Sequence, residues 1–318
     1  MSENHERILE AKHVTKKYSA PGGRTLTANS DINLCMYRGR TLGVVGESGC
    51  GKSTFMRMVL SLEEPTEGEI LYRGKNITKL KGEKLRQHRQ NIQMVFQDPS
   101  EAFNPKMKIM DIVCEPLLNF KRIKQSEKEQ AARRLLEMVE LPGDFAYRYP
   151  HNMSGGQRQR VGIARALALQ PKLIVCDEPV SALDVSIQAQ VINLLSDLQK
   201  QLDLAYLFIS HNLSVVEHIC QRIGVMYLGR IVELAPAEEL YAHPLHPYTQ
   251  ALISAIPTIG ESGRERMVLT GDLPSPTAPP SGCAFHTRCP YATDRCRTQA
   301  PVLTERSAGH WAACHLVV

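Results

Sequence analysis

The chain has 318 residues, of which 43% are hydrophobic and 22% charged, values that are ordinary for globular proteins and exclude a disordered or collagen-like chain. Its length accommodates about two domains with a sizeable core. The formal net charge of +5 is too small to predict nucleic acid or an anionic membrane surface as the partner. Residues 1–13 carry acidic side chains and no apolar core, unlike a secretory signal, and prolines interrupt the uncharged stretch after Leu240, unlike a membrane span.

A glycine-rich segment is the first informative feature along the chain. An apolar run over Thr41–Val45 predicts a strand and Lys52–Leu60 has helical composition. Between them stands Gly46-Glu47-Ser48-Gly49-Cys50-Gly51-Lys52-Ser53, followed by Thr54. This spacing matches the phosphate-binding loop, whose backbone N–H groups surround phosphate oxygens at a helix start. We expect Lys52 to bind the β and γ phosphates of a nucleotide and Ser53 to hold Mg²⁺; the alternative is an ordinary glycine-rich turn.

A helical region follows, and we expect it to form a subdomain inserted at about residues 103–165. Ser126 with Glu129 predicts one helix start, and another helix begins near Ser154. Ser154-Gly155-Gly156-Gln157 opens that second helix, where exposed N–H groups and the positive end of the helix dipole suit an anion. Since the phosphate loop already holds one nucleotide, this second site suits the nucleotide of another subunit. Simple N-terminal capping is the alternative.

Two further apolar runs end in polar residues. Leu173–Cys176 is followed by Asp177 and Glu178, and Ala205–Ile209 by Ser210 and His211. Buried strands with polar residues at their carboxyl ends are typical of a parallel α/β sheet with a ligand crevice. Asp177 is suited to hold Mg²⁺ through water and Glu178 to deprotonate an attacking water, although paired acids also occur in solvated turns.

From Tyr18 to Glu233 the chain resembles the ATP-binding cassette (ABC) ATPases. The resemblance rests on five motifs in order: Gly46–Ser53, Gln97 after Val95-Phe96, Ser154–Gln157, Asp177-Glu178 with Ser181-Ala182-Leu183-Asp184, and His211. It implies an α/β P-loop NTPase fold with a RecA-like sheet core and an inserted helical subdomain. Met153 stands where leucine is usual before Ser-Gly-Gly-Gln, a swap of similar volume.

The resemblance also implies roles for single residues. Tyr18 would stack on adenine, Gln97 would sense Mg²⁺ and the attacking water while contacting membrane subunits, and His211 would touch the γ-phosphate. Ser154, Gly156 and Asp184 would act across a dimer with a second ABC ATPase subunit. Taken alone, Tyr18 could be a strand aromatic and His211 a structural histidine.

Residues 241–318 resemble the extension of ATPase subunits in bacterial dipeptide and oligopeptide importers, and we expect residues 1–240 to form the nucleotide-binding domain. The matching segments are His246–Leu252 and Leu273–Pro276, together with four cysteines in the last 36 residues. The resemblance implies a dimer at the cytoplasmic face of the inner membrane, for which we expect a paralogous ATPase as the partner and a second copy of this chain is the alternative. It also implies two permease subunits, a periplasmic or lipid-anchored substrate-binding protein and no nucleic acid. Relatives that import nickel, glutathione or opine-type chelates leave other substrates open.

The chain has nine cysteines, of which Cys283, Cys289, Cys296 and Cys314 gather near its end. They form no Cys-x-x-Cys pair, which disfavours zinc. Four thiolates with Pro290 directly after Cys289 suit a 4Fe-4S cluster, which some members of this importer group carry. Four reduced thiols that pack a small domain are the remaining alternative.

Two other classes of ABC ATPase fit the chain less well. DNA-repair and chromosome ATPases insert a long coiled coil between the nucleotide motifs, but only 125 positions separate Lys52 from Asp177. ATPases that act on ribosomes usually carry two cassettes, and this chain has one.

Overall fold

The computed structural model describes residues 6–256, 267, 269 and 271–317. It divides into two compact units, one of Met1–Lys79 with Phe208–Val318 and one of Leu80–Leu207. Residues 1–5 of the acidic N-terminal segment and 257–266 of the predicted extension lie outside the described residues.

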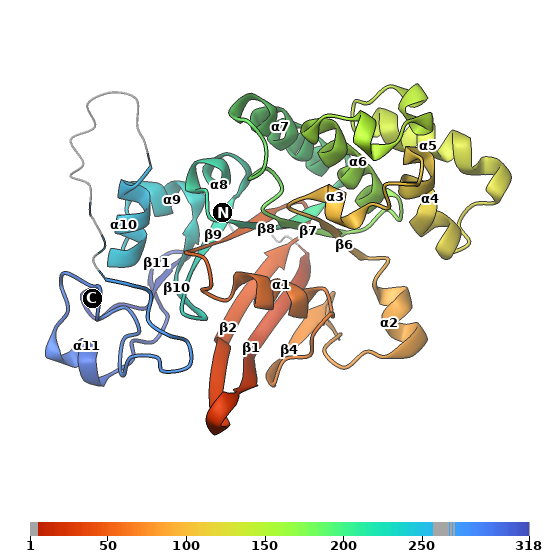
Figure 1. Ribbon diagram of the computed structural model, residues 1–318. Helices are drawn as coiled ribbons and strands as arrows, with labels where there is room; N and C mark the ends of the chain where they lie inside the picture. The colour runs from red at the N-terminus through yellow and green to blue at the C-terminus, as the bar shows by residue number, and fades with distance from the viewer. Residues whose placement is uncertain (1–5, 257–266, 268, 270, 318) are drawn as a thin grey trace. The chain divides into compact units, whose positions relative to one another are not determined.

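The first unit contains an antiparallel sheet in the order β2-β1-β4-β5. Figure 1 shows β2, β1 and β4 of this sheet. Its strands are β1 Arg7–Ala20, β2 Arg24–Tyr37, β4 Glu67–Tyr72 and β5 Lys75–Asn76, with a 3-10 turn at Pro21–Gly23 between β1 and β2. Alternate apolar residues such as Val14, Ile32 and Ile70 are buried, as expected when one face of a sheet packs on a core. Gly68 has φ +83° and a Cβ there would lie 2.2 Å from the His13 carbonyl oxygen, so only glycine fits.

A second sheet in this unit carries the phosphate loop. The strands of this sheet that lie wholly in the first unit run in the order β11-β12-β10-β9-β3, with β3 parallel to β9 and the other pairs antiparallel. They are β3 Thr41–Val45, β9 Arg222–Tyr227, β10 Arg230–Pro236, β11 Thr304–Ser307 and β12 His310–Ala312. The helices of the unit are α1 Lys52–Val59, α8 Leu213–Ile219, α9 Ala237–Ala242, α10 Pro247–Ser254 and α11 Asp294–Thr298. The C-terminal residues therefore extend the sheet that contains β3, because β12 pairs with β10.

A buried carboxylate in β10 binds the C-terminal residues to this sheet. Glu233 of β10 is fully buried and accepts hydrogen bonds from the backbone N–H groups of Leu245 (2.8 Å) and His246 (2.9 Å). Its Oε1 also lies 2.7 Å from Nε2 of the buried His310 in β12. With its oxygens satisfied in this way, the carboxylate connects three segments of the chain that are far apart in sequence.

The second unit is mainly helical. Its elements are α2 Gly82–His88, β6 Ile92–Val95, α3 Pro99–Ala102, α4 Ile109–Asn119, α5 Lys128–Met138, α6 Gly155–Leu167, β7 Leu173–Asp177 and α7 Val185–Leu202, with 3-10 turns at Gln125–Glu127, Gly143–Tyr147 and Pro150–Asn152. Helices α4, α5 and α6 pack together, and β6 pairs in parallel with β7 (Figure 1). Strand β8, Ala205–Ser210, lies where the chain passes from this unit back to the first.

Most of the predicted elements are confirmed, and one helix start is wrong. The strands at Thr41 and Leu173 and the helix after Ser154 begin where the sequence placed them. Helix α5 begins at Lys128 without a side-chain cap; the backbone N–H of Lys124 donates to Glu127 (2.6 Å) instead, and Glu129 pairs with Arg133. The preceding 3-10 turn moves the helix start beyond Ser126. The predicted subdomain at 103–165 and the boundary at residue 240 stay predictions.

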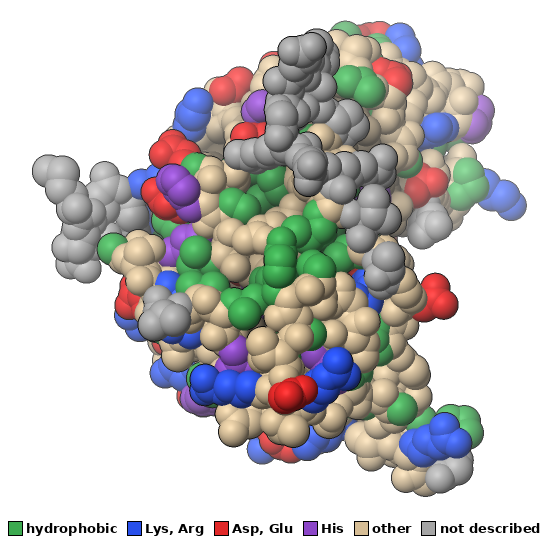
Figure 2. Space-filling view, turned by 90° about the vertical axis from the view of Figure 1, so that its left-hand side faces the viewer, with side chains coloured by type: hydrophobic (Ala, Val, Ile, Leu, Met, Phe, Trp, Pro, Cys, Tyr) green, Lys and Arg blue, Asp and Glu red, His purple; other side chains and the backbone are tan. Residues whose placement is uncertain are grey.

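The surface near the C-terminus is mixed in character. Figure 2 views this side, where hydrophobic side chains, histidines and side chains of both charges share the exposed face.

Among the described residues, no helix combines the length and the hydrophobicity that crossing a membrane requires.

Candidate functional site

The glycine-rich loop has the backbone that a phosphate-binding loop needs. Gly46, Gly49 and Gly51 have φ of +154°, +79° and +109°, and Gly51 caps α1. A Cβ would lie 2.2 Å from the Met226 carbonyl oxygen at Gly46 and 2.4 Å from the Ala28 carbonyl oxygen at Gly51. The two glycines therefore let the loop lie tightly against neighbouring backbone.

Lys52 turns back over the loop that precedes it. Its side chain is buried, and Nζ donates to the carbonyl oxygens of Gly46 (2.7 Å) and Glu47 (3.0 Å). Of the neighbouring loop residues, Ser48, Gly49 and Ser53 are exposed, Thr54 is half-buried and Cys50 is buried. The ammonium is thus held among backbone acceptors within the loop, and a phosphate oxygen is a stronger acceptor for the same group.

Tyr18 lies near the end of β1 in the same unit. Its hydroxyl donates to Glu63, and the ammonium of Lys16 lies 5.0 Å from the ring centroid. Partial burial, followed by the Glu63 carboxylate, raises the pKa of Tyr18. The ring is half-buried. His211 is exposed and directly follows β8.

The paired acids lie in the second unit at the carboxyl end of β7. Asp177 is the last residue of that strand and Glu178 follows it, both half-buried. Glu178 has φ +43°, a left-handed conformation that residues other than glycine adopt at a cost of about 1–2 kcal/mol. Such strain persists when the surrounding structure imposes it, and it is concentrated at functional sites.

Gln97 lies in the exposed loop between β6 and α3. The loop is held at both ends within this unit: Asp98 accepts a hydrogen bond from the backbone N–H of Ser100 (2.8 Å), and buried Gln159 of α6 donates to the carbonyl oxygen of Phe96 (3.1 Å). This last bond connects the Gln97 loop to the helix that Ser154 opens.

Helix α6 begins with a capping box. The backbone N–H of Gln157 donates to Oγ of Ser154 (3.3 Å), and the N–H of Ser154 donates to the side chain of Gln157 (3.0 Å). Gly155 is half-buried and Gly156 is buried; a Cβ on Gly156 would lie 2.5 Å from Cγ2 of Ile187 in α7. Capping therefore accounts for part of this motif, and it leaves Ser154 exposed at the helix start.

Asp184 caps the next helix, α7. It accepts hydrogen bonds from the backbone N–H of Ile187 (3.0 Å) and from Oγ of Ser186 (2.9 Å). These bonds, the backbone one first, lower the pKa of the exposed carboxyl group. Asp184 is thus held as a carboxylate at the N-terminus of α7.

The structure gathers the predicted site residues into two sets. Tyr18, Gly46–Thr54 and His211 belong to the first unit, and Gln97, Ser154–Gln157, Asp177, Glu178 and Asp184 belong to the second. Hydroxyl and carboxylate oxygens, as on Ser53 and Asp177, are the ligands that Mg²⁺ prefers. The roles of these residues stay predictions.

The four C-terminal cysteines lie in one module. The Cys283 backbone N–H donates to the Cys296 carbonyl oxygen (2.8 Å), and burial, with smaller contributions from the other three thiols, raises the pKa of Cys283 to about 11. Yet in the part of the chain that the structure describes, no three His, Cys, Asp or Glu side chains form a group that could hold a metal ion. This thiol arrangement does not by itself form a cluster site.

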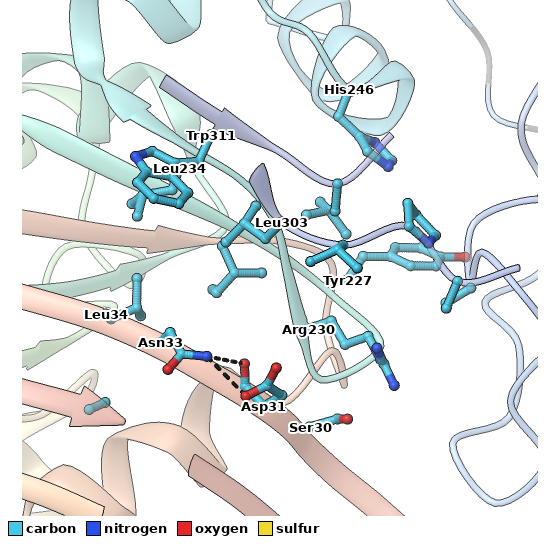
Figure 3. A pocket seen from close by; sticks show the side chains of 18 of the residues that line it. Ser30, Asp31, Asn33, Leu34, Tyr227, Arg230, Leu234, His246, Leu303 and Trp311 are labelled. Atoms are coloured by element: carbon cyan, nitrogen blue, oxygen red, sulfur yellow. Dashed lines mark hydrogen bonds between the residues drawn. The ribbon is translucent and has the colours of Figure 1, made fainter. Parts of the chain in front are cut away.

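A cavity of about 790 Å³ lies in the first unit (Figure 3). Its wall combines apolar side chains such as Leu234 and Trp311 with polar ones such as Asp31 and Asn33, whose amide donates to the Asp31 carboxylate (2.9 Å). No residue of the Gly46–Ser53 loop lines it, so this cavity is separate from the phosphate loop.

Sequence reasoning missed two residues that contact the loop. Arg288 forms a bidentate ion pair with Glu47, and the Tyr248 hydroxyl accepts a hydrogen bond from the Glu47 N–H. The His246-Pro247-Tyr248 segment stands out in the sequence only through the family resemblance. Arg288 gave no signal beyond its place directly before Cys289.

The fold and loop define a class of protein, the ATP-binding cassettes. The chain matches an ABC transporter family model over residues 29–181 and a model of the C-terminal region of oligopeptide/dipeptide transporters over residues 232–296. Among solved structures, it is similar to the dimeric cassette MJ0796 bound to ADP and Pi, with a TM-score of 0.66 and 31% identity over 72% of this chain and 99% of that one. The likeness to CbiO1 of Clostridium perfringens has a TM-score of 0.68 and 27% identity over 75% and 92% of the two chains.

Curated relatives match almost the whole length. The chain is 52% identical to the oligopeptide transport ATP-binding protein AppF of Bacillus subtilis (strain 168), over 98% of each protein. It is 48% identical to the putative oligopeptide transport ATP-binding protein YkfD of the same strain, over 97% of this chain and 95% of that one. The chain therefore belongs to the ATP-binding proteins of oligopeptide and dipeptide ABC transporters.

Proposed function

We propose that this chain hydrolyses ATP to power the import of dipeptides or oligopeptides across the bacterial inner membrane, at whose cytoplasmic face it acts. The observation that carries this proposal is the Gly46–Ser53 loop with Lys52 buried over it, in a chain that matches oligopeptide transport ATP-binding proteins along nearly its full length. Loop, lysine and helix start together are the elements that bind a nucleotide's phosphates.

Each site residue has a part in this reaction. Gly46–Thr54 bind the phosphates, with Lys52 placed at the β and γ phosphates, and Tyr18 stacks on the adenine. Ser53, Gln97 and Asp177 would hold Mg²⁺, which neutralises phosphate charge when bound. Glu178 takes a proton from the attacking water, and His211 contacts the γ-phosphate.

The chain works as part of a larger assembly. A second ABC ATPase subunit, which we propose to be a different chain, completes the site when Ser154, Gly155, Gly156, Gln157 and Asp184 approach its nucleotide. The exposed helix start at Ser154 and the similarity to a cassette described as dimeric support this pairing. Two permease subunits and a periplasmic or lipid-anchored binding protein complete the importer.

The proposal is tested by Glu178→Gln in the assembled transporter, with uptake of a labelled peptide into proteoliposomes measured beside ATP binding. Removing the general base while every phosphate donor stays in place should slow hydrolysis and uptake by about 10²- to 10⁴-fold at unchanged ATP affinity. Lys52→Ala is the matched control that should lose ATP binding as well. Peptide uptake at the wild-type rate in both variants would contradict the proposal.

The same vesicles test the other substrates. Nickel, glutathione and metal-chelate uptake should not depend on Glu178 if peptides are the cargo. ATP-dependent uptake of one of these compounds, with no uptake of peptides, would assign the chain to that substrate instead.

For the C-terminal tail, we propose that Cys283, Cys289, Cys296 and Cys314 bind a 4Fe-4S cluster, with zinc as the less favoured alternative. Four thiols within one small module support this, although binding would have to draw them closer together. Protein purified without oxygen should then be brown and hold about four irons per chain. Stoichiometric zinc in colourless protein would favour a zinc site, and metal-free folded protein would favour packed thiols.

A further inference from the structure

The phosphate loop is held from outside by a residue of the cysteine-bearing module. Arg288 donates from Nη1 to Oε2 of Glu47 (2.6 Å) and from Nη2 to Oε1 (3.1 Å). The Arg288 side chain is only 8% exposed and that of Glu47 30%. Because the pair is bidentate and mostly buried, it is stronger and more directional than a surface ion pair.

A second contact fixes the backbone of the same glutamate. The Glu47 N–H donates to the hydroxyl of Tyr248 (2.9 Å), whose side chain is fully buried. The Tyr248 ring packs on Tyr227 and Phe285, with centroids 4.8 and 5.4 Å away. Aromatic packing of this kind restricts the ring and so holds the hydroxyl in place.

Glu47 also contacts the lysine of the loop, because its carbonyl oxygen accepts a hydrogen bond from Nζ of Lys52 (3.0 Å). Its carboxylate, N–H and carbonyl thus contact Arg288, Tyr248 and Lys52 in turn. A change at Arg288 or Tyr248 can therefore reach Lys52 through a single residue.

Charge gives the Arg288 contact a second consequence. A carboxylate within a loop that binds phosphates repels them, and the repulsion is large where water is partly excluded. Arg288 neutralises this carboxylate through its bidentate contact, since a guanidinium is always charged in proteins.

We propose that Arg288 is a positioning residue for nucleotide binding: it neutralises Glu47 and, together with Tyr248, holds the phosphate loop in the conformation that places Lys52. This inference rests on the proposed function, since it assumes that the loop binds ATP. It makes the C-terminal module a determinant of ATP affinity, through residues that contact the phosphate loop at Glu47.

The test measures the dissociation constants of ATP and ADP on the full chain with Arg288→Met, Glu47→Gln and both changes together. Arg288→Met should weaken ATP binding by about tenfold or more, because it leaves Glu47 uncompensated. The loss should be smaller for ADP, which carries less charge. Glu47→Gln removes the repulsion, so the double variant should bind ATP within about threefold of the Glu47→Gln variant.

Two controls complete the design. Arg288→Lys keeps the charge but loses the bidentate contact, so its ATP affinity should lie between those of the wild type and Arg288→Met. Arg295→Met removes a charge from α11, where Nε donates to Gln299, and should leave ATP affinity unchanged. Unchanged ATP affinity in Arg288→Met would overturn this proposal. So would a double variant that loses as much ATP affinity as Arg288→Met alone. A wild-type chain that binds no ATP, or binds it equally well after Lys52→Ala, would overturn the proposed function instead.

Discussion

At the level of single residues, backbone conformation decides what the loop can do. Gly51 has φ +109°, and a Cβ added there would lie 2.4 Å from the Ala28 carbonyl oxygen. Gly49 has φ +79°, and a Cβ added there would have no atom within 4 Å. Gly51 is one of the two fixed glycines of the motif and Gly49 stands at a variable position, and of these two only Gly51 is enclosed. Their substitution by alanine should therefore have different costs.

Gly51→Ala should lower the free energy of unfolding by at least about 2 kcal/mol, because a Cβ at 2.4 Å from a backbone oxygen forces the loop to shift. Gly49→Ala should cost only the left-handed strain of about 1 kcal/mol. Urea unfolding of both variants without nucleotide measures this difference. Equal losses of stability in the two variants would show that a small movement of the loop makes room for the Cβ at position 51.

At the level of elements, the start of α6 has two functions, helix capping and the proposed contact with a partner's nucleotide. Substitutions of Ser154 by other capping residues can separate them. The Ser154 hydroxyl caps the helix, and we propose that it also faces the nucleotide of the partner subunit. Asparagine and aspartate both cap helices about as well as serine, but only aspartate adds a negative charge.

Ser154→Asn and Ser154→Asp should each keep the free energy of unfolding within about 0.5 kcal/mol of the wild type. Turnover in the assembled dimer should survive in the asparagine variant and fall by about 100-fold or more in the aspartate variant, because its carboxylate would repel the partner's γ-phosphate. Stability and ATPase rate, measured together, check this. Full turnover with aspartate would leave Ser154 with capping alone.

At the level of the whole molecule, buried polar contacts join the C-terminal residues to the cassette sheet. Glu233 connects β10 to His310 of β12 and to the backbone before α10. His246 caps α10, with Nδ1 accepting a hydrogen bond from the Tyr248 N–H (3.0 Å). Burial lowers the pKa of His246 to about 4, although the Glu233 carboxylate opposes the shift.

This shift gives the junction a pH dependence with a definite sign. Between about pH 6.5 and pH 4 the unfolded chain binds a proton at His246 and the folded chain does not, so stability falls as the pH falls through this window. From about pH 7 to pH 5, the loss should be about 2 kcal/mol. His246→Asn retains an acceptor for the Tyr248 N–H and should remove this component of the pH dependence, as urea unfolding at both pH values would show. An equal slope in wild type and variant would assign the dependence to other groups.

The sequence alone determined the local chemistry of the molecule. The phosphate loop, its flanking strand and helix, the start of α6 and the carboxyl end of β7 were predictable because each depends on neighbouring residues, through glycine freedom, capping and buried apolar runs. The start of α5 was mistaken because a 3-10 turn replaced the expected cap at Ser126.

Only the tertiary structure decided what holds the loop. Glu47 and Arg288 are 241 positions apart and Glu233 and His310 are 77 apart, separations at which no local pattern relates two side chains. His310 reaches Glu233 because β12 pairs with β10, and a strand pairing of this kind is set by packing over the whole unit. In the sequence, the nucleotide loop and the C-terminal extension look like parts of two separate domains. In the folded chain, these contacts join them.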